Sequence, residues 1–181
     1  MKVYFIKIAL RGVSPMVWRR LRVPGSASLA MLHDCIQIIN SWDDDYLHQF
    51  HIYGKDYGLN YPGGLNYSDN VHEIYLDDFQ FDIGDKFTYE YNFFEHLIHD
   101  IRIENIRDFL PTKNNVICLS GQGMPSATKS DVMDVEFKFL ERIVENNGLT
   151  SADIDEFREK INRVKFNKKS VNSNLLSSIK I

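Results

Sequence analysis

The sequence has few cysteines and no long apolar run, and each absence excludes a class of protein. Two cysteines in 181 residues are too few for a disulfide framework, so we expect Cys35 and Cys118 to be reduced and buried. No stretch approaches the roughly 18 apolar residues of a membrane span, and the start, MKVYFIKIALRG, lacks the pattern of a signal peptide. We therefore expect a cytoplasmic protein with no membrane partner.

The sequence also lacks an excess of basic residues. Its formal net charge of −4 at pH 7 argues against a general nucleic-acid binder, although a local basic face is compatible with that total. It has no phosphate-binding loop, dinucleotide fingerprint, nucleophile elbow or paired C-x-x-C motif. With 44% hydrophobic residues, the chain can build a core without a disulfide or a structural metal.

What the sequence does contain is one long amphipathic helix, predicted over residues 28–42. Its apolar side chains occupy half of a helical wheel, which is typical of a helix lying on a sheet. Ser26 or Ser28 can cap its start. The polar half includes His33 and Gln37, which we expect at the surface. The apolar half consists of Leu29, Met31, Leu32, Cys35, Ile36, Ile38, Ile39 and Trp42.

Strand-like alternation lies on both sides of this helix. Residues 2–11 and 16–23 predict a hairpin before it. A hairpin, a long helix packed across it and further strands indicate an α+β fold, mostly antiparallel, with C-terminal helices. We expect a loop over 54–70 and irregular structure over 105–128. The predicted later strands are residues 48–53, 71–76, 79–83, 86–93 and 96–104.

The domain organisation follows from these segments. Residues 1–128 predict one α+β domain, and residues 129–166 predict a helical extension that packs on the same domain. The extension has apolar residues at helical spacing over 131–146 and 150–164. The tail, 167–181, is rich in Ser, Asn and Lys, so we expect it to be partly ordered.

Three stretches carry a resemblance to a known family: PMVWRRLRVP, LHDCIQIINSWDDDYLHQFHIYGKDYG and FTYEYNFFEH. They resemble the plasmid pRiA4b ORF-3-like family, over about residues 1–125. The resemblance implies an α+β domain of uncharacterised function, and labels of some relatives imply a link to mobile genetic elements. The third stretch has Asn92-Phe93-Phe94 where the family has D-F-G-D-x-W. A later family segment survives only as Cys118, Gly121 and Pro125.

The predicted hairpin presents a basic and aromatic strip. Trp18, Arg20 and Arg22 point outward from the second strand, next to Phe5, Lys7 and Arg11 of the first. Such a strip can bind a phosphate backbone and stack bases. Alternatively the C-terminal helices cover it. The acidic residues of these helices, which could then pair with the arginines, are Asp131, Asp134, Glu141 and Glu145.

Asp43, Asp44 and Asp45 form an acidic corner at the end of the helix, where carboxylates oppose the helix dipole. Either these carboxylates are simply solvated, or a partner such as Arg19, a cation or another molecule offsets their unfavourable interaction with the dipole. Arg19 falls on the inward side of its strand and needs a carboxylate if it is buried. We therefore predict a structural ion pair between Arg19 and Asp43 or Asp44.

The histidine spacing does not predict a metal site. His48 and His51 are three residues apart, as are His96 and His99, and on strands that spacing puts each pair on opposite faces. A site would need histidines from two strands and an aspartate. We therefore expect neither a bound transition metal nor a cofactor.

Taken together, the sequence favours a non-enzymatic binding module for a protein or nucleic-acid partner. The alternative is a metal-assisted hydrolase or nuclease with Asp43, Asp44 and His48 around a divalent cation. The missing family acids weigh against an enzyme. The candidate binding residues are Trp18, Arg20, Arg22, Trp42, Asp43, Asp44 and His48.

Overall fold

The computed structural model describes residues 2–14, 16–62, 64–108, 115–123 and 166–179. Within them lies one seven-stranded sheet in the order β4-β3-β5-β6-β1-β2-β7, and every neighbouring pair is antiparallel. This confirms the predicted α+β class with an antiparallel sheet. The strands are β1 (Lys2–Leu10), β2 (Trp18–Pro24), β3 (His48–Ile52), β4 (Lys55–Tyr57), β5 (Lys86–Tyr91), β6 (Leu97–Asp108) and β7 (Ile117–Gln122).

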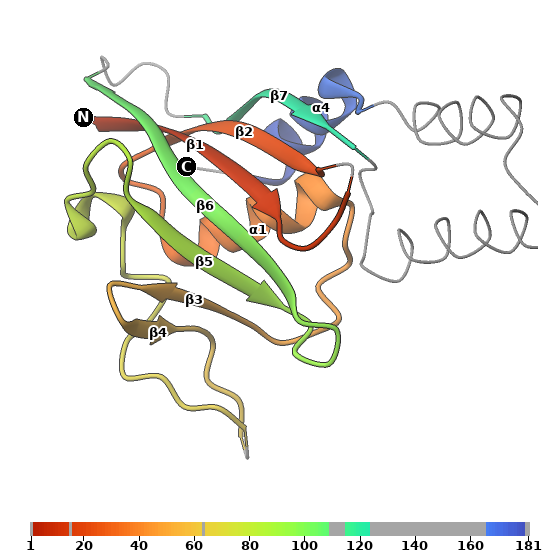
Figure 1. The fold of residues 1–181 in the computed structure, drawn as a ribbon. Coiled ribbons are helices and arrows are strands. Elements are labelled where there is room, and N and C mark those ends of the chain that lie inside the picture. The colour runs from red at the N-terminus through yellow and green to blue at the C-terminus, as the bar shows by residue number, and fades with distance from the viewer. Residues whose placement is uncertain (1, 15, 63, 109–114, 124–165, 180–181) are drawn as a thin grey trace, which may run out of the picture.

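The long helix forms as α1 (Leu29–Asn40) and lies on one face of the sheet (Figure 1). The Ser28 side chain accepts a hydrogen bond from the Met31 amide, which satisfies one of the free donors of the first turn. The helix ends where Ser41 adopts a left-handed conformation with φ of 56°. Among the described residues, no helix is long and apolar enough to span a membrane.

The core fills the space between α1 and the inner face of the sheet. Strand alternation supplies it, because every second side chain of β1, β2, β3, β5 and β6 is buried there. From its predicted apolar half the helix buries Leu29, Leu32, Cys35, Ile36 and Ile39. Met31, Ile38 and Trp42 are only half-buried, and Asn40 of the predicted polar half is buried as well. The largest fully buried side chains of this core include Tyr4, Ile6, Leu21, Leu32, Ile36, Phe50 and Tyr89.

Several segments outside the main strands differ from the prediction. Residues 71–76 and 79–83 form no strand; instead a short 3-10 helix, η1 (Leu76–Phe79), buries Leu76 beneath the core. Part of the predicted loop 54–70 pairs with β3 as the edge strand β4. Within 105–128, β6 continues to Asp108 and β7 pairs with β2. Tertiary pairing and not local alternation makes β4 and β7 into strands.

The C-terminal prediction is only partly accessible to comparison. Both predicted helices, 131–146 and 150–164, lie outside the described residues. The described part of the tail contains one helix, α4 (Lys168–Ser178). The Asn167 side chain caps this helix, and Val171 and Leu175 are buried one turn apart. That pair packs α4 beside β7 and α1.

Candidate functional site

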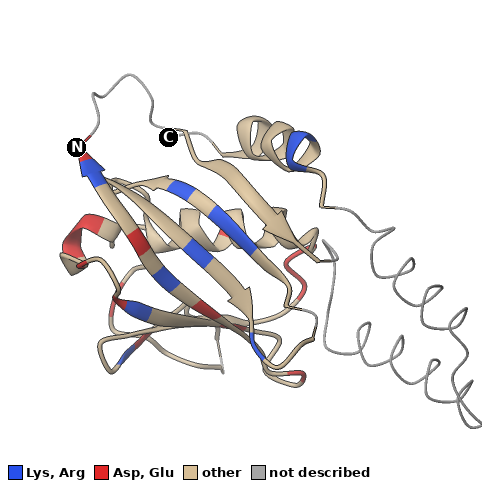
Figure 2. Ribbon diagram, turned by 45° about the horizontal axis from the view of Figure 1, so that its top comes forward, with Lys and Arg blue, Asp and Glu red and all other residues tan. Residues whose placement is uncertain are grey.

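The outer face of the sheet, opposite α1 and α4, carries polar and charged side chains, and no described helix covers it (Figure 2). Trp18, Arg20 and Arg22 lie on this face and are half-buried, as the alternation of β2 predicts. Lys7 and Phe5 lie beside them on β1. The basic and aromatic strip therefore lies on the face that the described helices leave uncovered; the predicted helices that could cover it, within 129–166, lie outside the described residues.

Four cations form a row across this face. Lys7 of β1 pairs directly with Arg20 of β2 on one side and with Arg102 of β6 on the other. Arg102 in turn pairs with Lys86 of β5. Like charges directly opposite each other destabilise a sheet, so this cation row costs stability unless anions are close by. Four strands about 4.8 Å apart give the row a length of roughly 14 Å.

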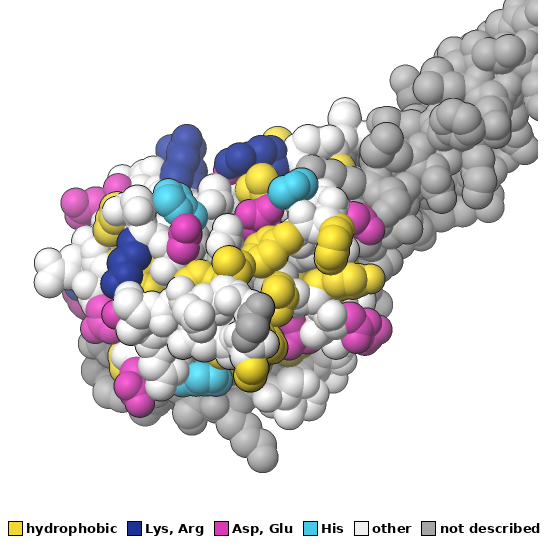
Figure 3. All heavy atoms as spheres, turned by 90° about the horizontal axis from the view of Figure 1, so that it is seen from below, with side chains coloured by type: hydrophobic (Ala, Val, Ile, Leu, Met, Phe, Trp, Pro, Cys, Tyr) yellow, Lys and Arg dark blue, Asp and Glu magenta, His cyan; other side chains and the backbone are white. Residues whose placement is uncertain are grey.

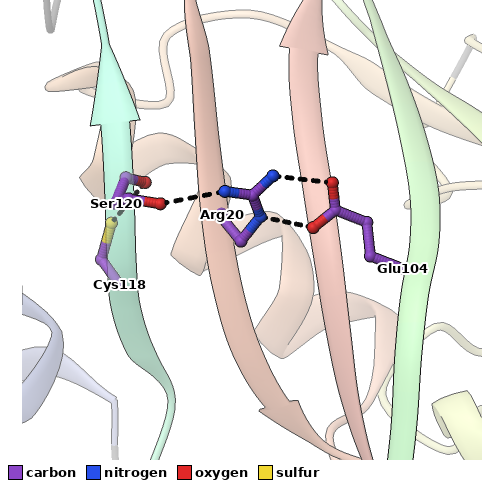
Figure 4. Close-up of polar contacts among 4 residues, drawn as sticks. All are labelled: Arg20, Glu104, Cys118 and Ser120. Carbon is purple, nitrogen blue, oxygen red and sulfur yellow. Dashed lines mark hydrogen bonds and ion pairs between the residues drawn. The ribbon is translucent and has the colours of Figure 1, made fainter.

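Two acids of the outer face, Glu104 and Asp100, are each paired with an arginine. Glu104 of β6 reaches across β1 to Arg20 and accepts two hydrogen bonds from its guanidinium, one of them 2.9 Å long (Figure 4). The Ser120 hydroxyl lies 3.3 Å from the same guanidinium. Asp100 is paired with Arg11. The arginine partners hold the pKa values of both carboxyls below their ordinary values.

The remaining cations of the face are more available. Within the described part of the chain, Lys86 and Arg102 are exposed and form no ion pair. The Lys7 ammonium lies 5.2 Å from the centre of the Trp18 ring, a cation–π contact, and it forms no ion pair within the described part of the chain. The cation row therefore presents a positive surface on a chain whose net charge is negative.

Arg19 is buried as predicted, with 1% of its surface exposed, but its predicted ion pair with Asp43 or Asp44 does not form. Its guanidinium donates to the backbone carbonyls of Trp18 at 2.8 Å and Gln122 at 2.7 Å, and also to that of Ile39 at 3.3 Å. The charge is held by carbonyl dipoles at the end of α1 and along β2 and β7. Burial lowers the pKa of Arg19 to about 10.

Gly121 is the residue that makes room for this arrangement. A Cβ at position 121 would lie 2.7 Å from Cδ of Arg19 and 3.0 Å from the Trp18 carbonyl oxygen. Because β7 has no side chain at position 121, the Arg19 side chain can pass close to the β7 backbone. The sequence shows the glycine but not the strand on which it lies.

A second group of polar side chains lies between α1 and the sheet, and we call it the histidine cluster: His33, Asp44, His48 and Tyr89. The imidazole rings of His33 and His48 stack with centroids 3.5 Å apart and planes 11° apart. His33 Nε2 lies 3.0 Å from Oδ1 of Asp44, and His33 Nδ1 lies 2.9 Å from the Tyr89 hydroxyl. Both histidines are buried, whereas Asp44 is exposed.

The histidine cluster corrects the expectation that His33 and Gln37 lie at the surface. Gln37 is 5% exposed and donates from Nε2 to the Tyr89 hydroxyl at 2.8 Å. Both side chains turn from the polar half of α1 toward β5, where the tyrosine supplies a polar group inside the core. Both also lie in LHDCIQIINSWDDDYLHQFHIYGKDYG, the second stretch that carries the family resemblance, which is the signal that could have identified them.

Buried polar atoms without hydrogen-bond partners gather near the histidine cluster. Trp42 stacks on Tyr91 with centroids 4.8 Å apart and meets the His99 ring at 5.4 Å. Few buried polar groups in proteins are left unpaired, so several near one another mark a site and not a plain core. In the described residues these atoms are Gln37 Oε1, Trp42 Nε1, Asn92 Oδ1 and His99 Nε2.

Burial sets the charge of the histidine cluster. It lowers the pKa of His33 to about 4 and that of His48 to about 3, with the neighbouring His33 lowering the latter further. Burial raises the pKa of Asp44 above its ordinary value. At neutral pH the two stacked imidazoles are therefore uncharged, with Asp44 at their exposed edge.

The predicted acidic corner is divided by the structure. Asp43, Asp44 and Asp45 are all exposed, but only Asp44 turns toward a histidine. His51 lies exposed on the opposite side of β3 from the buried His48, as the alternation predicts, whereas the exposed His96 lies in the turn before β6 and not on a strand with His99. The ligand atoms of His33, Asp44 and His48 all lie within 4.8 Å of one another, a convergence that strand spacing could not show.

An exposed apolar patch lies next to the acidic corner. It consists of Tyr46, Leu47 and Phe94, which are 50%, 36% and 93% exposed. The Asn92 amide donates to the Leu47 carbonyl at 3.0 Å, which holds the β5–β6 turn beside the loop before β3. The lower side of the molecule shows apolar side chains gathered among acidic and histidine side chains (Figure 3).

The comparisons with known proteins bear on both surfaces. Residues 2–174 match the family model described as plasmid pRiA4b ORF-3-like protein, which is nearly the whole chain. The chain belongs to this family. The family assignment rests on a match that includes the strip on β2, the helix α1 and the loop carrying Asp44.

Two individual proteins are similar to this member of the plasmid pRiA4b ORF-3-like family. The uncharacterized protein y4hQ of Sinorhizobium fredii (strain NBRC 101917 / NGR234) is 30% identical over 100 residues, which are 55% of this chain and 52% of y4hQ. The chain thus spans about half the length of this relative. The crystal structure of MM3350, a protein of unknown function from Methanosarcina mazei Go1, is similar with a TM-score of 0.64 at 27% identity. It covers 80% of this chain and 82% of its own.

Proposed function

We propose that this protein is a non-enzymatic binding module whose outer sheet face holds single-stranded nucleic acid. The observation that carries the proposal is the cation row, Arg20, Lys7, Arg102 and Lys86, on four adjacent strands. A sheet that tolerates directly opposed cations gains stability when a polyanion binds them. Phosphate oxygens are the ligands that such a row recognises without reading sequence.

The shape of the face favours a single strand. An open antiparallel sheet with aromatic side chains among cations offers stacking platforms to unpaired bases, whereas a duplex hides its bases inside. Trp18 and Phe5 supply rings on this face, and Arg107 lies 5.7 Å from the Phe5 ring centre. The negative total charge limits nonspecific attraction, so binding is confined to the positive face.

The direct test is a binding titration of the full chain with fluorescently labelled single-stranded RNA, single-stranded DNA and a duplex, read by anisotropy at low salt. We expect the single strands to bind more tightly than the duplex. Arg102→Glu combined with Lys86→Glu should weaken single-strand binding by about tenfold or more, because two phosphate contacts become repulsive.

The matched control is Lys168→Glu with Lys169→Glu, which makes the same change of net charge on α4, on the other side of the sheet. We expect this control to leave the affinity within about twofold, since exposed charges beyond a Debye length are screened. An equal loss in both double variants, or no binding of any nucleic acid, would contradict the proposal. If no nucleic acid binds, the patch of Tyr46, Leu47 and Phe94 becomes the candidate binding surface, with a protein as the partner.

A second candidate function is a metal-assisted hydrolase or nuclease. The convergence of Asp44 and His48 with His33 favours it. Asp43, the third residue of the predicted metal site, does not belong to that group. Incubation of the labelled strands with the protein and a divalent cation tests it, because cleavage products would favour this candidate over a binding module.

We further propose that the protein is located in the cytoplasm and that it is linked to mobile genetic elements. The first rests on the two free cysteines, which suit a reducing compartment. The second rests on the family resemblance alone and is a matter of association.

A further inference from the structure

We infer that His33, His48 and Asp44 form a binding site for one divalent transition-metal ion. The inference reverses the expectation from the sequence that no metal is bound, and it does not depend on the proposed function of the outer sheet face. The three residues come from α1, β3 and the loop between them. They are the one group of metal-ligating residues that converges in this way within the described chain.

The donor set is what such an ion requires. Two imidazole nitrogens and one carboxylate oxygen lie within 4.8 Å of one another, close enough to reach a shared ion by small side-chain rotations. This combination, with positions left open, is typical of zinc or non-haem iron(II). Asp44 is exposed, so the open positions face solvent and an ion can enter from that side.

His48 has a ring that is held by its neighbours while its nitrogens stay available to a ligand. It is 4% exposed, its ring stacks on His33 and lies against Tyr89, and within the described part of the chain it makes no hydrogen bond. Neither of its ring nitrogens is among the fully buried polar atoms that lack a partner, so they reach the solvent edge from which an ion would enter. A divalent ion is a ligand that suits an uncharged imidazole nitrogen.

The surroundings of His33 resemble those of a ligating histidine. Its Nδ1 contacts the Tyr89 hydroxyl, which accepts a hydrogen bond from Gln37 Nε2. A hydrogen bond on the far nitrogen fixes the ring and its tautomer, which is the usual arrangement behind a metal ligand. Nε2 then faces Asp44 at 3.0 Å, so a metal ion would replace a proton between these two atoms.

The stacked rings set one condition on this site. A metal ion lies in the plane of each imidazole that binds it, and parallel planes 3.5 Å apart cannot share such a position. The rings of His33 and His48 must therefore splay when the ion enters. The unpaired oxygen of Gln37, next to Tyr89, shows that the polar groups here retain capacity for further contacts.

The test is calorimetric titration of tag-free, EDTA-treated full chain with zinc chloride, with cobalt(II) absorption as a second readout. We expect one ion per chain and an increase in the visible absorption of cobalt as it becomes ligated. Asp44→Asn should weaken binding by about 100-fold or more, beyond the effect typical of an outer-shell partner. Its control is Asp45→Asn, an equally exposed neighbour, which should bind as the parent does.

Two further variants separate ligation from structure. His48→Asn should abolish binding, whereas His51→Asn, on the exposed side of the same strand, should leave it unchanged. Tyr89→Phe keeps the ring and removes the hydroxyl, so it should weaken binding by about 10- to 100-fold. The inference is overturned if the parent binds no ion, or if Asp44→Asn and Asp45→Asn bind zinc equally. Asp44 is exposed, so this comparison does not depend on a core substitution.

Discussion

Glu104 holds Arg20 across an intervening strand, since β1 lies between β6 and β2 in the sheet. The pair therefore brackets Lys7, which stands between them on β1 and carries the same charge as Arg20. One carboxylate thus supports two neighbouring cations of the row. At the other end of the row, Arg102 and Lys86 form no ion pair among the described residues.

The Arg20–Glu104 pair should show a measurable coupling energy. Its side chains are 36% and 26% exposed and meet in a two-bond geometry, so we expect a coupling near the upper end for surface pairs, about 1 kcal/mol. Urea denaturation of Arg20→Gln, Glu104→Gln and the double variant measures it. The Arg11–Asp100 pair, with both side chains about half exposed, is the control and should couple by less. A larger coupling for Arg11–Asp100 would show that exposure does not govern these pairs.

Ile36 of α1 should be essential to the core. It is 0% exposed, so Ile36→Ala removes buried methyl groups and leaves a cavity, at a cost of about 2–5 kcal/mol. Ile83→Ala makes the same chemical change at a side chain that is 63% exposed, and it should change the free energy of unfolding by no more than about 0.5 kcal/mol. Similar denaturation midpoints for the two variants would place α1 off the sheet.

Arg19→Met should destabilise the fold even though Arg19 has neither predicted aspartate as a partner. The substitution withdraws donors from the carbonyls of Trp18, Ile39 and Gln122, and a buried carbonyl without a partner costs about 1–3 kcal/mol. We expect a loss of about 3 kcal/mol by chemical denaturation. Arg102→Met, an exposed site on the outer face, is the control and should stay within about 0.5 kcal/mol. Equal effects would mean that the carbonyl contacts do not stabilise the fold.

Mild acid should destabilise the protein through the histidine cluster. The folded-state pKa values of His33 and His48, about 4 and 3, lie below the ordinary value of 6.5, so the unfolded chain binds more protons as the pH falls below about 6.5. The contribution of these two histidines to the free energy of unfolding is therefore fully present above about pH 6.5 and is lost as the pH falls toward 4. Between pH 7 and pH 5 each histidine should remove about 1–2 kcal/mol.

Urea denaturation in EDTA at pH 7 and pH 5 measures this loss, and His48→Asn should show a smaller one than His51→Asn. The carboxyls of Asp100 and Glu104, whose pKa values are lowered by their arginines, lose their contribution only below about pH 4. The interval from pH 7 to pH 5 therefore isolates the histidines. Equal losses in the two variants would contradict the assignment of buried, neutral His48.

Periodicity alone was enough to predict the main elements and the facing of their side chains. The period of two in β1 and β2 placed Leu21 inward and Arg20 outward, and the helical wheel of α1 separated Ile36 correctly. Those patterns are local, and burial follows them directly. β4 and β7 were missed because each is a strand only through its neighbour, and neither has a clear alternation of its own.

The site residues were harder to predict for a related reason. A helical wheel sorts side chains by polarity, so it placed His33 on the polar half, although Tyr89 of β5 lets this polar ring enter the core. Burial predicts a carboxylate partner for Arg19, but its guanidinium donates to backbone carbonyls and not to Asp43 or Asp44. In both cases a contacting residue, Tyr89 for His33 and Gln122 for Arg19, lies far along the chain. Which residue comes into contact therefore depends on the order of the strands in the sheet.

The most direct test of the central claim is the salt dependence of single-strand binding. If the four cations of the row each neutralise one phosphate, a plot of log affinity against log salt concentration should have a slope of about −3. Arg102→Gln should reduce the magnitude of that slope by about 0.7, while Lys169→Gln should leave it unchanged. A slope near zero, or one that Arg102→Gln does not alter, would contradict binding of nucleic acid by the outer sheet face.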